Sequence, residues 1–110
     1  IKRKLKISEN ENKLFGEDSI ISIKNIDYKI VYHIRFHLAE GLIFNFTNNK
    51  KNIILRSNFK NMWVFKSDNE LVVEDSIIVD KNITLPTKQI VIKGITNKNK
   101  IIRKWSLEKI

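Results

Sequence analysis

The feature that most constrains the fold is an alternation of apolar and polar side chains over residues 31–38, in which only Val31 departs from the pattern. In an extended chain, successive side chains point to opposite faces. One face would carry Tyr32, Ile34, Phe36 and Leu38. The other would carry Val31, His33, Arg35 and His37. A helix would scatter both sets, so we predict a strand. Its apolar face needs a core, and its polar face holds both histidines and one of the four arginines of the chain.

The rest of the chain also divides into short apolar or alternating segments, separated by polar turns. The predicted strands are residues 2–8, 20–24, 28–38, 42–47, 52–56, 62–66, 70–79, 88–93 and 101–107. Gly16 is expected in a turn, and Pro86 in a loop or at a sheet edge. No helical period is evident. The pattern predicts an all-β fold, an antiparallel β-sandwich of about nine or ten short strands, with a barrel as the related alternative.

The totals limit the function classes. A chain of 110 residues fits one domain, residues 1–110, and a chain that begins with Ile1 is expected to be a piece of a longer protein. Without cysteine, neither disulfides nor thiolate metal sites can form. No apolar run approaches the ~18–20 residues of a membrane span. Neither a Gly-rich phosphate loop nor a Gly-x-Ser-x-Gly elbow occurs, so nucleotide and serine hydrolase chemistry have no support.

The formal net charge of +9 has two interpretations. Lys, Asn and Ile supply 50 of the 110 residues, and A/T-rich codons encode all three, so compositional drift alone would raise the lysine content. The lysines are also spread along the chain rather than clustered, which gives no sign of a specific nucleic-acid site. The alternative is a functional field that attracts an anionic ligand.

Seven segments, in order, are similar to the C-terminal region of heparinase II/III-like polysaccharide lyases. They are KRKLKIS (2–8), LFGED (14–18), IRFHL (34–38), MWVF (62–65), EDS (74–76), TKQIVIKG (87–94) and KWSL (104–107). The last four resemble the Gly-Trp-x-Phe, Glu-Glu/Asp-Ser, Thr-x-Gln-Ile-Val-Val-x-Gly and Lys/Arg-Trp-x-Leu segments of that family. Their succession, more than any single motif, carries the resemblance, which covers nearly the whole chain.

The resemblance implies a C-terminal β-sandwich that works with an N-terminal α/α-toroid domain of the same parent chain. Such lyases cleave anionic, uronic-acid-containing polysaccharides by β-elimination, and the groups that remove and supply protons lie largely on the toroid. We therefore expect this chain to be inactive alone. The resemblance implies a periplasmic or cell-envelope location, although the residues specify no compartment. From another class, the alternative is a binding or scaffold sandwich for acidic glycans or other polyanions.

In several members of this family the sandwich holds zinc through His, Asp and His. By resemblance, the second and third ligands would be Asp18 and His37, whereas the first position falls at Ile1, which cannot bind a metal. The site is thus incomplete, since two protein ligands rarely hold zinc. The alternative is that His37 is a hydrogen-bonded histidine packed against Asp18, with no metal.

Three other groups of residues have two interpretations each. Arg35 could form an ion pair with Glu17 or Asp18, or it could contact a substrate carboxylate. His33 could be a surface residue or a weak substrate contact. Trp63 and Trp105 could stack on sugars, but each shares its face with an apolar residue two positions away, so we expect core packing.

Overall fold

The computed structural model describes residues 2–21, 28–39, 41–47, 49–57 and 61–110. Within them the elements are nine β-strands, which confirms the all-β prediction. They are β1 (Lys2–Ile7), β2 (Lys13–Ile21), β3 (Ile30–His37), β4 (Ile43–Phe46), β5 (Asn52–Arg56), β6 (Met62–Ser67), β7 (Leu71–Asp80), β8 (Ile83–Thr96) and β9 (Lys100–Lys109). In these residues no helix is long and apolar enough to cross a membrane.

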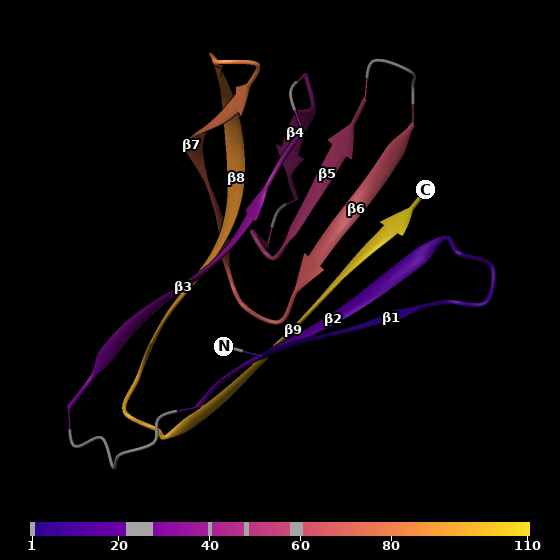
Figure 1. The fold of residues 1–110 in the computed structure, drawn as a ribbon. Coiled ribbons are helices and arrows are strands. Elements are labelled where there is room, and N and C mark those ends of the chain that lie inside the picture. Colours follow the sequence, from indigo (N-terminus) through magenta and orange to yellow (C-terminus); the bar gives the residue numbers. More distant parts are fainter. Residues whose placement is uncertain (1, 22–27, 40, 48, 58–60) are drawn as a thin grey trace.

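The strands form two antiparallel sheets that face each other (Figure 1). The larger sheet has the order β1-β2-β9-β6-β5-β4, and the smaller has the order β3-β8-β7. The C-terminal strand β9 lies inside the larger sheet, between β2 and β6. Strand β2 pairs with β1 on one side and with β9 on the other, so the first and last strands belong to the same sheet.

The core lies between the sheets and follows from the alternation of each strand. The alternation over residues 31–38 is confirmed, since Tyr32, Ile34 and Leu38 are buried and His33, Arg35 and His37 are exposed. The fully buried aliphatic side chains come from both sheets; among them are Ile53, Leu71, Ile90 and Ile92. Burying each such side chain contributes about 1.5–3 kcal/mol, so these positions fix how the sheets pack.

The segment around Gly16 corrects one expectation. We predicted a turn at Gly16, but β2 runs without interruption from Lys13 to Ile21. The glycine serves a close approach instead. A Cβ at Gly16 would lie only 2.0 Å from Cε2 of Trp105, which is opposite Gly16 on β9. The indole ring of Trp105 thus rests against the bare backbone of β2, a packing that only glycine permits.

The β7–β8 hairpin turns at Lys81 and Asn82, after the predicted strand 70–79, and β8 begins at Ile83, before the predicted strand 88–93. Lys81 and Asn82 have φ angles of 48° and 66°, as two-residue hairpin turns of type I′ require. Pro86 lies within β8 opposite Ile77, at a point before β3 begins to pair with β8 at Gln89. Because β8 has only one hydrogen-bonded neighbour there, the missing N–H of Pro86 leaves no gap in the sheet, so its edge assignment holds.

Strand β1 differs from the prediction. The alternation over the predicted strand 2–8 is typical of a half-buried strand, but all six residues of β1 are exposed, including Leu5 and Ile7. The reason is its place at the edge of the larger sheet, where it has a neighbouring strand on one side only. Alternation predicted which face of β1 turns inward but not whether that face is covered.

Candidate functional site

The outward face of the three-stranded sheet carries a network of charged side chains. Arg35 of β3 forms an ion pair with Glu74 of β7, with 2.9 Å between Nη1 and Oε2. Lys93 of β8 reaches the other carboxylate oxygen, with 3.1 Å between Nζ and Oε1. Hydrogen bonds from these two cations hold the pKa of Glu74 below its usual value. One carboxylate is therefore shared by two cations across three strands. Val91, which lies between Arg35 and Val72 on this face, is fully buried.

Both histidines belong to this same outward face. Nδ1 of His33 lies 3.1 Å from Nη2 of Arg35, so the imidazole can accept a hydrogen bond from the guanidinium. Nδ1 of His37 lies 3.0 Å from the hydroxyl oxygen of Ser76 on β7. The two side chains are four residues apart on one strand, or about 13 Å, so they cannot act together on one small group.

The predicted pairing of Arg35 with Glu17 or Asp18 is wrong. Arg35 faces outward from the smaller sheet, whereas Asp18 faces the interior of the sandwich from the larger sheet. The register between β3, β8 and β7 brings Glu74 to Arg35 instead. These partners are 39 residues apart in sequence, so a local sequence pattern could not predict that they form an ion pair.

Asp18 is fully buried, and its partner is Arg3 of the neighbouring strand β1. The guanidinium donates from Nε to Oδ1 at 2.7 Å and from Nη2 to Oδ2 at 2.8 Å. This two-point pair raises the pKa of Arg3, which keeps the side chain cationic. The guanidinium also lies 4.7 Å from the ring centre of Phe36 and 5.5 Å from that of Trp105. Sequence reasoning missed Arg3, although its position on the same face as Leu5 and Ile7 was a usable signal.

The residues do not fit the zinc site that the resemblance implied. Both oxygens of Asp18 accept hydrogen bonds from Arg3, and His37 lies on the far side of the smaller sheet, bonded to Ser76. The first ligand position, Ile1, lies outside the described residues. Among the described residues, no group of three His, Cys, Asp or Glu side chains converges on one point. Zinc binding by Asp18 and His37 therefore stays a prediction from resemblance, without a supporting donor set in this fold.

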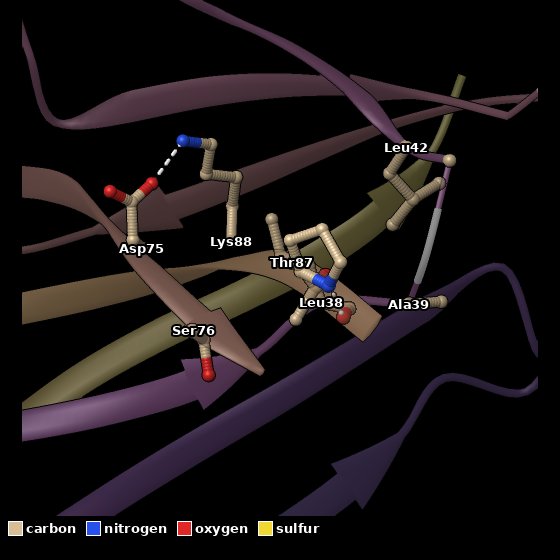
Figure 2. Close-up of a pocket in the computed structure, with 9 residues that line it drawn as sticks. Leu38, Ala39, Leu42, Asp75, Ser76, Thr87 and Lys88 are labelled. Atoms are coloured by element: carbon tan, nitrogen blue, oxygen red, sulfur yellow. Dashed lines mark hydrogen bonds and ion pairs between the residues drawn. The ribbon is translucent and has the colours of Figure 1, made fainter. Parts of the chain in front are cut away.

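A small pocket opens where β3 ends beside the β7–β8 hairpin (Figure 2). Its volume is about 250 Å³. Thr87 donates a hydrogen bond from its hydroxyl to the carbonyl of Leu38 at 2.9 Å, which closes one wall. Figure 2 shows the ammonium of Lys88 directed at Asp75, with which it forms an ion pair, while the hydroxyl of Ser76 points away from that pair. Because this lysine is already neutralised, the pocket offers no free charge to a ligand.

The tryptophans belong to the packing between the sheets. Trp105 is buried; its ring stacks on Phe65 with centroids 5.6 Å apart and meets the edge of Phe36 at 4.8 Å. Trp63 is partly buried and packs against the same core. The core interpretation is confirmed for Trp105, and neither ring forms an exposed platform for sugars.

Fold and site together define an antiparallel β-sandwich domain with an ion-paired outer sheet and a two-point ion pair between exposed Arg3 and buried Asp18. A family model described as "Heparinase II/III-like, C-terminal" matches residues 1–106. The chain therefore belongs to the heparinase II/III-like family, as its C-terminal domain, which confirms the resemblance. Searches of curated proteins and of solved structures returned no match.

Proposed function

We propose that this chain is the C-terminal sandwich of a heparinase II/III-like polysaccharide lyase, which cleaves a uronic-acid-containing polysaccharide by β-elimination only with the toroid domain of its parent chain. The family match across residues 1–106 carries this proposal. It names a C-terminal unit, and a C-terminal unit implies a longer parent chain. The role of the sandwich would be to support the toroid and contact the anionic polymer.

The chemistry of β-elimination explains why the isolated domain should be inactive. A base must remove the proton next to the uronate carboxylate, and an acid must assist the departing oxygen, both within hydrogen-bond reach of one sugar. Among the described residues the imidazoles of His33 and His37 lie on one face but about 13 Å apart. Each is also engaged by a neighbouring side chain.

The test is to incubate the 110-residue chain with several uronic-acid-containing polysaccharides and follow the ultraviolet absorbance of the unsaturated uronate product. The parent chain, carrying its toroid, serves as the positive control. We expect turnover with the parent chain and none with the sandwich alone. Efficient turnover by the sandwich would contradict this division of roles, and an inactive parent chain would contradict the lyase assignment.

The second candidate is a binding or scaffold module for acidic polymers, which the net charge of +9 favours. Attraction by diffuse charge alone predicts similar binding to unrelated polyanions, with an affinity that falls steeply as salt rises. Binding that instead discriminates among polyanions of equal charge density would reject that candidate in its simplest form.

A further inference from the structure

An open pocket of about 600 Å³ lies at the junction of β3, β8 and β9, and Lys93 of the charged outer face is among its lining residues. Its lining combines Tyr32, Arg103, Lys93 and Asn69 with the apolar side chains of Val31 and Ile95. The volume is within the range of about 300–1,000 Å³ that small-ligand sites occupy. No carboxylate is among the described residues that line it, so the pocket is cationic.

The lack of a carboxylate partner for Arg103 follows from the hydrogen bonds of its neighbour in the larger sheet, Asp18. Asp18 is paired in register with Arg3 on one side and with Arg103 on the other, so two arginines adjoin one aspartate in the sheet. Both oxygens of Asp18 accept hydrogen bonds from Arg3. Within the described part of the chain, Arg103 accordingly forms no ion pair with a carboxylate. Lys93, in contrast, is paired with Glu74.

Arg103 is held in a fixed orientation. Its Nε donates to the hydroxyl oxygen of Tyr32 at 2.6 Å, and its Nη1 donates to the carbonyl of Ile102 at 3.1 Å. The guanidinium carbon lies 5.6 Å from the centre of the Tyr32 ring. Tyr32 itself is buried against Gly94, where an added Cβ would lie 2.1 Å from the tyrosine hydroxyl. Bare backbone at Gly94 is thus needed for the pair that orients Arg103.

We propose that this pocket binds the carboxylate of a uronic acid residue, with Arg103 as the charged contact. A planar guanidinium matches a planar carboxylate better than an ammonium does. The hydroxyl of Tyr32 accepts from Arg103 and keeps its own hydrogen to donate to the ligand. Exposed Val31 and Ile95 supply an apolar flank for the C–H face of a sugar ring. The choice of a uronate over another carboxylate rests on the proposed function.

The experiment titrates the 110-residue chain with trigalacturonate and with a glucuronic-acid disaccharide, and follows the backbone amide signals of Lys93, Gly94 and Ile95 by NMR. Fully methyl-esterified trigalacturonate keeps the shape of the first probe and lacks its charge. Glucose 6-sulfate tests whether any anionic sugar suffices. We expect shifts with at least one acid, and none with the ester or the sulfate.

Arg103→Gln is compared with Lys104→Gln, which removes the same charge from the next residue of β9, on the opposite face. Loss of a charge-assisted contact should weaken acid binding about tenfold or more for Arg103→Gln. Lys104→Gln should change binding less than about twofold, as expected for a surface charge. Tyr32→Phe, which keeps the ring on Gly94, should weaken binding by about two- to tenfold. Unchanged melting of each variant shows that the fold is intact.

Equal losses for Arg103→Gln and Lys104→Gln would overturn the proposal, as would binding of the ester, binding of glucose 6-sulfate as tight as that of the acids, or binding of neither acid. Failure of the lyase proposal gives a different result. If the parent chain cleaves no polysaccharide but Arg103 still governs uronate binding, the pocket stands and the lyase assignment falls.

Discussion

The pair of exposed Arg3 and fully buried Asp18 leads to a quantitative prediction for Arg3→Ala. The substitution leaves a fully buried carboxylate without either of its hydrogen-bond donors at 2.7 and 2.8 Å. Removing one partner of a buried ion pair costs about 3–5 kcal/mol. The side chain of Arg3 is 40% exposed, so water can reach the truncated site, and we discount this term to about 2–3 kcal/mol. Lost contact with the rings of Phe36 and Trp105 adds about 0.5–1 kcal/mol.

The expected total is therefore about 3 kcal/mol, a large part of the ~5–15 kcal/mol that stabilises a domain of this size. With an unfolding entropy of about 2.1 cal/mol/K per residue, 1 kcal/mol corresponds to about 4 °C, so the melting temperature should fall by about 12 °C. Circular dichroism during heating, with urea denaturation as a second measure, gives both quantities. Arg3→Lys keeps the charge but loses the fork geometry, and should fall between Arg3→Ala and the unaltered chain.

Lys4→Ala is the matched control, because Lys4 is the next residue of β1, is exposed and carries the same charge. It should change stability by no more than about 0.5 kcal/mol. If Arg3→Ala costs no more stability than Lys4→Ala, the Arg3–Asp18 ion pair contributes nothing and the reasoning is refuted.

Addition of EDTA to the unaltered chain gives a second check. Since Arg3 supplies the positive charge beside Asp18, chelation should leave the melting temperature unchanged, and a fall comparable to that of Arg3→Ala would indicate a structural metal.

Three further predictions concern other elements. Glu74→Gln should be less stable than the unaltered chain near neutral pH, and this difference should shrink as pH falls through the lowered pKa of Glu74. The reason is that a lowered carboxyl pKa stabilises the fold only while the group is ionised. Urea denaturation at several pH values measures the difference, and a difference that does not depend on pH would contradict the prediction. Gly16→Ala should lower the free energy of unfolding by about 1–3 kcal/mol and alter the near-ultraviolet circular dichroism of Trp105, since the new Cβ would overlap the indole. An unchanged spectrum would mean that the ring does not pack on Gly16. Ile53→Ala should cost about 2–5 kcal/mol in urea denaturation, whereas Ile102→Ala, at a partly exposed position, should cost clearly less; equal losses would contradict the assigned core.

Side-chain alternation predicted the strand faces because the period of two is a local property of extended chain. It therefore placed Tyr32 and Ile34 in the core and left His33 and Arg35 exposed, as the structure shows. It could not predict whether a given strand face is covered by the opposite sheet. Leu5 and Ile7 of β1 stay exposed because β1 is the edge strand of the larger sheet, and its place there depends on topology rather than on any residue of β1.

The partners of the charged residues were beyond local pattern for a related reason. Arg35 meets Glu74 and Asp18 meets Arg3 through strand registers that link segments 39 and 15 residues apart. A carboxylate can be recognised in sequence, but which cation reaches it depends on how strands align. Gly16 shows the same limit, because its partner ring, Trp105, comes from the other end of the chain.

These ion pairs also lead to a test that distinguishes binding of anions by diffuse charge from binding at one local site. Arg35 and Lys93 share Glu74, and Arg3 is committed to Asp18, so an anion must compete with an internal carboxylate for each of them. Arg103 has no such competitor among the described carboxylates. If the net charge of +9 acts as a whole, glutamine at any one of these positions should weaken polyanion binding equally. If geometry matters, Arg103→Gln should weaken it far more than Arg35→Gln, and the difference should persist at high salt, which screens the diffuse field more than a close contact.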